Sequence, residues 1–270
     1  RGMSDDDLAT VPELPALLEV RGVTRGFYGV RALNGVDLVV KAGQITGLIG
    51  PNGAGKTTLF NCISGLVPPN SGRILFNGED ITGWRPDRVT RRGLVRTFQI
   101  ARGCPRLTVR ENLLLYGADQ PGEGVVAALL RTQAMRLREQ DLQQRAIEIA
   151  DRLRLTRELD NKAAGLSGGQ KKLLEIGRAL MAKPKLVLLD EPIAGVNPSL
   201  ARQIGDRLRA LVADGISLVL IEHQMDMIAR LCDHVIVMAE GRHLTEGTFA
   251  AVSADAAVQE AYMGRPRWTC

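Results

Sequence analysis

The sequence predicts an α/β fold in which one sheet is assembled from both halves of the chain, with a helical segment inserted between them. Short apolar runs of strand length alternate with helical patterns early in the 270 residues and again in their second half. Between these regions the apolar residues follow a helical period instead. This alternation is typical of a sheet covered by helices.

The N-terminal part is expected to begin the sheet, after a flexible N-terminus over residues 1–15. Strands are predicted over Leu17–Val23, Val36–Val40 and Ile45–Ile49, and a helix from about Lys56. A further pair of strands is predicted at Gly72–Asn77 and Leu94–Phe98, separated by a turn-rich stretch over residues 77–80.

The middle of the chain is predicted to be helical. Thr108-Val-Arg-Glu111 forms a capping box before an apolar helix, which we expect to end at Pro121-Gly122. One face of a second, amphipathic helix is formed by Leu142, Ala146, Ile149, Ala150 and Leu153. We therefore assign residues 100–165 to a helical subdomain, inserted between core segments 16–99 and 166–250.

The strand pattern returns after this insertion. A helix is predicted from Ser167 to about Ala182, where Pro184 stops it. The expected strands are Leu186–Leu189, Ser217–Glu222 and Val235–Ala239, and residues 251–270 form a C-terminal tail with a short helix.

Composition limits the possible classes of protein. The hydrophobic share is 45%, and no apolar run reaches the roughly 18 to 20 residues that span a bilayer. The acidic, proline-containing N-terminus lacks the pattern of a secretory signal. Four cysteines are scattered without CxxC spacing, so neither a zinc site nor a disulfide framework is expected. We expect a protein of the reducing cytosol.

Charge is concentrated in one stretch. Eight arginines lie between Arg85 and Arg110, and Asp87 is the only acid among them, in a chain of net charge +5. Two explanations stay open: a solvated basic face, or a docking surface for a protein or an anionic membrane. Aromatic residues are sparse in the stretch, so nucleic acid is not expected as a partner.

The clearest motif is Gly50-Pro-Asn-Gly-Ala-Gly-Lys56-Thr57, placed between a predicted strand and a predicted helix. Backbone N–H groups of such a loop converge on phosphate oxygens, Lys56 neutralises the β- and γ-phosphates, and the Thr57 hydroxyl ligates Mg²⁺. The predicted ATP-binding residues are Gly50, Pro51, Asn52, Gly53, Ala54, Gly55, Lys56, Thr57 and Thr58.

Two carboxylates follow the apolar strand Leu186–Leu189. Ligands bind at the carboxyl edge of such sheets, so we expect Asp190 to hold Mg²⁺ through water and Glu191 to act as general base on the attacking water. Without the phosphate loop upstream, the same pair would indicate only the end of a strand.

A second anion-binding helix start is predicted at Leu166, Ser167, Gly168, Gly169 and Gln170. The serine N-cap and two glycines leave free N–H groups at the positive end of a helix. An ordinary capped helix is the simpler interpretation. Because the chain already has a phosphate loop, we expect this helix start to complete a site on a second subunit, so that ATP joins two such domains face to face.

Together and in this order, these motifs resemble those of the ATP-binding cassette superfamily, and the likeness runs from about Leu17 to Gly264. The resemblance implies a phosphate-loop NTPase core with a mixed sheet, an antiparallel β subdomain and an inserted helical subdomain. It also implies that Gln99 contacts Mg²⁺ and the attacking water and links to membrane subunits, and that His223 contacts the γ-phosphate.

The family places an aromatic side chain against adenine, and Phe27 and Tyr28 are the candidates. Spacing back from Ala32-Leu33 favours Phe27. Edge packing is the other explanation for an aromatic residue at this point.

Four stretches resemble the ATP-binding subunits of branched-chain amino acid importers: residues 45–61, 96–99, 194–198 and 258–264. Asn197 replaces the Asp of the wider superfamily, and Gly168 stands where this subfamily often has an aromatic residue. The resemblance implies two ATPase subunits, alike or different, beneath two membrane permeases at the cytoplasmic face, with an external binding protein that presents the solute.

Other functions were weighed. A cassette ATPase for urea, short amides or outward lipid transport would carry the same motifs. Cassette proteins of DNA repair or translation generally have paired cassettes or long coiled-coil insertions, and the sequence has neither. A non-hydrolysing regulatory subunit disagrees with the intact Lys56, Asp190, Glu191 and His223.

Overall fold

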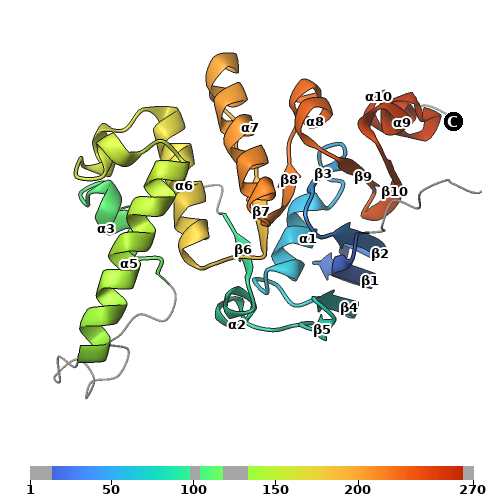
Figure 1. Cartoon of the computed structure of the whole chain (residues 1–270). Coiled ribbons are helices and arrows are strands. Elements are labelled where there is room, and N and C mark those ends of the chain that lie inside the picture. Colours follow the sequence, from blue (N-terminus) through green and yellow to red (C-terminus); the bar gives the residue numbers. More distant parts are fainter. Residues whose placement is uncertain (1–13, 98–103, 118–132, 264–270) are drawn as a thin grey trace, which may run out of the picture.

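The computed structural model describes residues 14–97, 104–117 and 133–263, in two sheets and the helices around them (Figure 1). The larger sheet has six strands in the order β10-β9-β3-β8-β7-β6, and the smaller has four in the order β2-β1-β4-β5. All pairs in the larger sheet are parallel except β9 with β10, and all pairs in the smaller sheet are antiparallel. The predicted α/β fold with a mixed sheet and an antiparallel β part is confirmed.

The six-stranded sheet is the core of the molecule. Its strands are β3 (Ile45–Ile49), β6 (Leu94–Arg96), β7 (Leu186–Asp190), β8 (Ser217–Ile221), β9 (His234–Ala239) and β10 (Arg242–Gly247). Every residue of β3, β7 and β8 is buried, as expected for parallel strands that are covered on both faces.

The four-stranded sheet corrects one prediction. Its strands are β1 (Ala16–Phe27), β2 (Val30–Lys41), β4 (Ser71–Phe76) and β5 (Glu79–Asp80). β4 pairs with β1 and β5, whereas β6 lies parallel to β7 in the other sheet, so the predicted pairing of Gly72–Asn77 with Leu94–Phe98 is wrong. The reason is the short helix α2 (Pro86–Arg91), which carries the chain from one sheet to the other, where Leu94 and Val95 are buried.

Two hydrophobic clusters lie on opposite faces of the six-stranded sheet. One contains α1 (Lys56–Ile63) and the inner face of the four-stranded sheet. The other contains residues of α6 (Gly168–Met181), α7 (Pro198–Ala213) and α8 (Met225–Leu231). Alternate residues of β7 enter each cluster, since Leu186 and Leu188 join the first while Val187 and Leu189 join the second.

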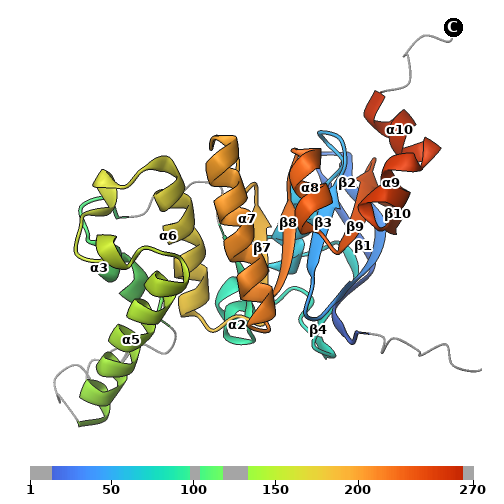
Figure 2. The ribbon, with the colours of Figure 1, turned by 45° about the horizontal axis from the view of Figure 1, so that its top comes forward.

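The remaining helices lie at the two ends of the molecule (Figures 1 and 2). At one end are α3 (Val109–Leu114), α5 (Gln133–Arg152) and the short turns Thr156–Glu158 and Ala163–Gly165. At the other are α9 (Phe249–Ala254) and α10 (Ala256–Met263). The structure contains no helix long and apolar enough to cross a membrane in residues 14–97, 104–117 and 133–263.

The helical end confirms two predictions and corrects a third. The Thr108–Glu111 capping box is formed, and all five residues of the predicted apolar face are buried, four of them on α5 and Leu153 directly after it. The first helix ends at Leu114 instead of continuing to Pro121, because the next amides bond three residues back, Tyr116 N–H to Leu113 and Gly117 N–H to Leu114. Pro121-Gly122 lies outside the described residues, as do residues 1–13, Phe98 and residues 264–270.

Candidate nucleotide-binding and hydrolysis site

The phosphate loop, residues 50–57, connects β3 to α1 as predicted. A side chain at Gly50 would overlap the Met238 carbonyl oxygen. Gly55 has φ of +96° and directly precedes α1, and a side chain there would overlap the Ala32 carbonyl oxygen. Both positions therefore require glycine, since only glycine combines this backbone with so close an approach.

The Lys56 side chain bonds to the backbone of this loop. Its Nζ donates to the Gly50 carbonyl at 2.6 Å and to the Pro51 carbonyl at 3.0 Å, and the side chain is buried. Burial lowers the pKa of Lys56, and the charges of Glu191 and Asp190 oppose that shift. The ammonium is thus held at the loop by two backbone carbonyls, and two carboxylates are near enough for their charges to act on it.

The two carboxylates come from the end of β7. Asp190 is 3% exposed, and Glu191 adopts a left-handed backbone with φ of +51°. The Glu191 N–H donates to the Ile221 carbonyl at 3.0 Å, which continues the pairing of β7 with β8. Glu191 Oε1 lies 3.2 Å from His223 Nε2. The structure therefore brings together the predicted general base and the predicted γ-phosphate contact.

Sequence reasoning gave no role to Glu222, which lies beside this pair. Its side chain is buried and accepts the Ile193 N–H at 3.0 Å and the His223 N–H at 3.3 Å. Burial raises the pKa of Glu222, the two N–H groups oppose this, and the nearby Glu191 adds to it. Glu222 therefore fixes the backbone on both sides of the Glu191–His223 pair. The signal available in the sequence for this role was an acidic residue at the end of a predicted apolar strand.

Arg96 was also missed. Its guanidinium lies at Asp190, with Nη2 to Oδ2 at 2.9 Å, and both side chains are more than nine-tenths buried. In the sequence the residue appears as part of the string 96–99 and as one of the eight clustered arginines, with no role of its own. The partners are 94 positions apart, so no local pattern could have paired them.

The second helix start has the predicted serine N-cap, and Gln170 completes it as a capping box. Ser167 Oγ accepts the Gln170 N–H at 3.3 Å, and Gln170 Oε1 accepts the Ser167 N–H at 2.8 Å. Ser167 and Gly168 are exposed. Gly169 packs so closely on Leu200 that a side chain at position 169 would displace the Leu200 side chain. α6 and α1 pack on opposite faces of the six-stranded sheet, so the two helix starts belong to separate layers of the fold.

The adenine candidates differ in their surroundings. Phe27 is the last residue of β1, is 37% exposed, and has the Arg25 guanidinium 4.7 Å from its ring centre. Tyr28 is fully exposed in the turn with φ of +47°. The preference for Phe27 stays a prediction. Gln99 lies outside the described residues.

The arginine-rich stretch is partly neutralised by acids from other segments. Arg92 pairs with Glu79 at 2.7 Å, Arg110 with Asp160 at 2.9 Å, and Arg96 with Asp190. The Arg88 guanidinium stacks 3.3 Å from the centre of the Trp84 ring. Acids therefore neutralise several arginines in the described part of the stretch, and its two explanations, a solvated basic face or a docking surface, stay predictions.

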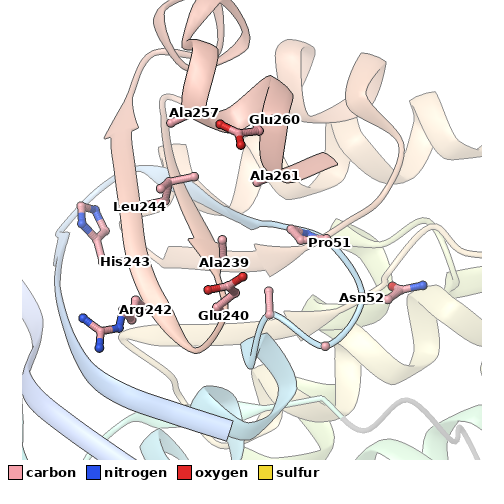
Figure 3. A pocket seen from close by; sticks show the side chains of 12 residues that line it. Pro51, Asn52, Ala239, Glu240, Arg242, His243, Leu244, Ala257, Glu260 and Ala261 are labelled. Atoms are coloured by element: carbon pink, nitrogen blue, oxygen red, sulfur yellow. The ribbon is translucent and has the colours of Figure 1, made fainter. Parts of the chain in front are cut away.

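A cavity of about 710 Å³ lies beside the phosphate loop (Figure 3). The loop residues Pro51 and Asn52 form one side, β10 forms another, and α10 contributes Glu260 and Ala261. Its lining includes the loop residues Gly53 and Ala54 as well, but among the described residues it does not include Lys56, Asp190 or Glu191, so this cavity adjoins the predicted phosphate site along one side of the loop. Burial raises the pKa of Tyr262 on α10, opposed by the backbone N–H of Gly50.

The residues present fit Mg²⁺ and a nucleoside triphosphate. In the part of the chain that the structure describes, no side chain caps the start of α1, so its first N–H groups remain directed at the loop. No cluster of three or more His, Cys, Asp or Glu suited to a metal occurs among the described residues. Magnesium bound through one or two oxygen ligands, waters and substrate phosphates needs no such cluster.

Loop, ammonium, paired carboxylates and imidazole define a phosphate-loop nucleotide hydrolase. Comparison with known proteins then gives the family. The family model described as "ABC transporter" matches residues 33–194, which is more than half of the chain. The chain belongs to the ABC transporter family.

Its relatives are similar over almost their whole length. The chain is 40% identical to the probable branched-chain amino acid transport ATP-binding protein LivG of Methanocaldococcus jannaschii, covering 92% of this chain and 97% of that one. It is 39% identical to the high-affinity branched-chain amino acid transport ATP-binding protein BraF of Pseudomonas aeruginosa, with 92% and 98% covered. For LivG of Escherichia coli (strain K12) the identity is 35%, with 92% and 98% covered.

Solved structures agree with this. The ADP conformation of an ATP-binding cassette of an ABC transporter has a TM-score of 0.81 and 40% identity, covering 93% of this chain and all of the other. A nucleotide-free ATP-binding cassette gives the same TM-score at 39% identity and the same coverage. The predicted fold of an ABC nucleotide-binding domain is confirmed.

Proposed function

We propose that this chain is the ATP-hydrolysing subunit of an ABC importer that drives uptake of branched-chain amino acids through separate membrane permeases. The observation that carries the proposal is the approach of Glu191 to His223 at 3.2 Å, at the sheet edge that also holds Asp190 and the Lys56 loop. The choice of solute is supported by the names of the relatives alone.

In this proposal each residue has a separate task. The loop N–H groups and the Lys56 ammonium bind the phosphates, while the Thr57 hydroxyl, Asp190 and Gln99 would hold Mg²⁺. Magnesium, when bound, neutralises charge on the phosphate oxygens. Glu191 accepts the proton of the water that attacks the γ-phosphate, and His223 orients the Glu191 carboxylate and the phosphate.

The exposed Ser167 start supports a second ATP-binding subunit, either another copy or a related chain. In that arrangement its N–H groups would complete a site formed by the partner's phosphate loop. Two permeases, an external binding protein and a position at the cytoplasmic face of the membrane belong to the same proposal. Residues 100–165 would form the helical subdomain that meets the permeases, and no nucleic acid is expected as a partner.

Reconstitution tests this function. The chain is co-purified with its membrane subunits, placed in lipid vesicles, and assayed for ATP turnover with solute-loaded binding protein. Stimulation by leucine, isoleucine or valine is expected, with the Glu191→Gln complex as the inactive control. Stimulation by urea or short amides alone would contradict the solute, and binding to DNA or RNA without recovery of membrane subunits would contradict the transport function.

A further inference from the structure

Arg96 is a buried cation that joins three elements of the nucleotide site. It lies on β6, its Nη2 bonds Asp190 on β7 at 2.9 Å, and its Nη1 donates to Asn61 Oδ1 on α1. Its guanidinium carbon is 5.7 Å from the centre of the Phe60 ring, also on α1. Nε has no hydrogen-bond partner among the described residues. The two terminal nitrogens are thus divided between two different elements.

The division matters because of what each element carries. α1 begins with Lys56 and Thr57, the residues proposed to bind phosphate and Mg²⁺. β7 ends with Asp190, the carboxylate proposed for Mg²⁺. A planar guanidinium can hold both partners at fixed angles, whereas an ammonium acts as a point charge. Arg96 therefore fixes the distance between the phosphate-loop helix and the carboxylate.

The contact also selects one oxygen of Asp190. Oδ2 accepts the Arg96 N–H, and no hydrogen bond from the described residues reaches Oδ1, which leaves that oxygen for a ligand. The charge of Asp190 also acts on Lys56, so the carboxylate is near both cations of the site. A carboxylate with one oxygen held by an outer partner presents the other oxygen in a single orientation.

We propose that Arg96 is a positioning residue for Mg²⁺–ATP: it holds Oδ2 of Asp190 and ties that carboxylate to α1, so that Oδ1 meets the metal. The inference rests on the proposed function, because it takes Asp190 as the Mg²⁺ carboxylate. It adds a residue for which the sequence motifs assign no role. Since a buried ion pair contributes little net stability compared with apolar packing, the arrangement is better explained by the orientation of Asp190.

The experiment measures how strongly Mg²⁺ enhances binding of a fluorescent ATP analogue to the whole chain, by titrating Mg²⁺ and by repeating the measurement in EDTA. For Arg96→Lys and Arg96→Gln, we expect a half-saturating Mg²⁺ concentration about 10- to 100-fold higher, the range seen when outer partners of metal ligands are removed. Binding in EDTA should change less than about twofold, since no metal is then oriented. A purely structural role would weaken both measurements alike.

Three further substitutions keep the test decisive. Asn61→Ala removes only the α1 partner of Arg96 and should raise the Mg²⁺ requirement less than Arg96→Lys does. Arg230→Gln removes an exposed arginine paired with Asp206 and should change neither measurement. In an Asp190→Asn background, Arg96→Lys should have no further effect on the Mg²⁺ requirement, because the two residues act through one carboxylate. Circular dichroism identifies any variant that fails to fold.

The outcomes separate the two claims. If Mg²⁺ fails to strengthen binding to the unaltered chain, the proposed function is wrong. If Mg²⁺ strengthens it and the folded Arg96→Lys and Asn61→Ala variants keep the original requirement, the function stands and the role of Arg96 is overturned. A raised requirement that persists undiminished in the Asp190→Asn background would also overturn it, because Arg96 would then act without Asp190.

Discussion

The two helix starts predicted to bind anions have different surroundings. At α1 the helix start lies with a buried ammonium, two nearby carboxylates and a loop in which Gly50 and Gly55 leave no room for a side chain. At α6 the start is capped by its own Ser167 and Gln170 and is exposed to solvent. The first start has its chemical partners within the chain. The second start has its capping hydrogen bonds formed within the chain and is exposed to solvent, as a site shared with another subunit requires.

The largest expected effect is the loss of hydrolysis at the α1 site, with the α6 helix start left intact. Glu191→Gln should slow ATP hydrolysis by roughly a hundredfold or more while nucleotide affinity stays within about twofold, because only the proton acceptor is lost. Steady-state turnover and equilibrium binding measure the two quantities. Glu148→Gln, on the exposed face of α5, is the matched control. Normal turnover in the Glu191 variant would show that Glu191 is not the general base.

The next effect concerns the ammonium. Lys56→Ala should weaken ATP binding about 10- to 100-fold, equivalent to losing a charge-assisted hydrogen bond of about 1.5–3 kcal/mol. Lys185→Ala, at the exposed opposite end of β7, should leave affinity unchanged. Calorimetric titration with ATP compares them, and equal affinities in the two variants would contradict the phosphate-binding role of the loop.

A smaller effect is expected from a substitution that changes only the α6 helix start. Ser167→Ala should leave ATP binding to one subunit unchanged but weaken ATP-dependent subunit association by about tenfold, the value of one hydrogen bond of about 1.4 kcal/mol. Thr248→Ala removes the corresponding cap of α9 and controls for the loss of a cap itself. Analytical ultracentrifugation with ATP tests the pair. If both variants lose association equally, the Ser167 start has no special part in it.

The smallest expected effect is a pH dependence of the free energy of unfolding, caused by Glu222 beside the Glu191–His223 pair. Burial raises the pKa of Glu222 above its ordinary 4.5, so its contribution to stability is full below pH 4.5 and is lost as pH rises through the raised value. Glu222→Gln should flatten this part of the curve of unfolding free energy against pH. Urea unfolding across the acidic range measures it, and parallel curves for the two proteins would contradict the assignment.

The phosphate loop, the β7 carboxylates and both helix starts could be predicted because each is a local arrangement of a few consecutive residues. Gly50, Gly55 and the Ser167 N-cap lie where their spacing predicts. The partners of β4 and β6 could not be predicted in this way, since membership of a sheet depends on long-range packing. β10 was missed because its sequence, Arg242–Gly247, alternates between exposed and half-buried positions and has few apolar residues.

The same distinction applies to the site. The strings containing Arg96 and Glu222 were visible in the sequence, but their roles depend on contacts with Asp190 and Ile193 from distant segments. Gln99 and the choice between Phe27 and Tyr28 stay predictions. Local patterns could therefore name the residues that we propose to bind the nucleotide, and the structure was needed to find the residues from distant segments that contact them.

The most direct test asks whether the exposed Ser167 start becomes covered when ATP binds. A Ser167→Cys chain carrying Glu191→Gln, with Cys104 and Cys270 replaced by serine, is labelled with a thiol reagent in the complete transporter. The native thiols that remain are slow to react, because burial raises the pKa of Cys62 to about 11 and of Cys232 to about 12. Thr248→Cys in the same background is the control for an exposed helix cap.

The account predicts that ATP with Mg²⁺ lowers the labelling rate at position 167 by at least about tenfold, because two subunits close over shared nucleotides, and leaves position 248 unchanged. An unchanged labelling rate at position 167, in a complex shown to have bound ATP, would contradict the claim that this helix start completes a second subunit's site.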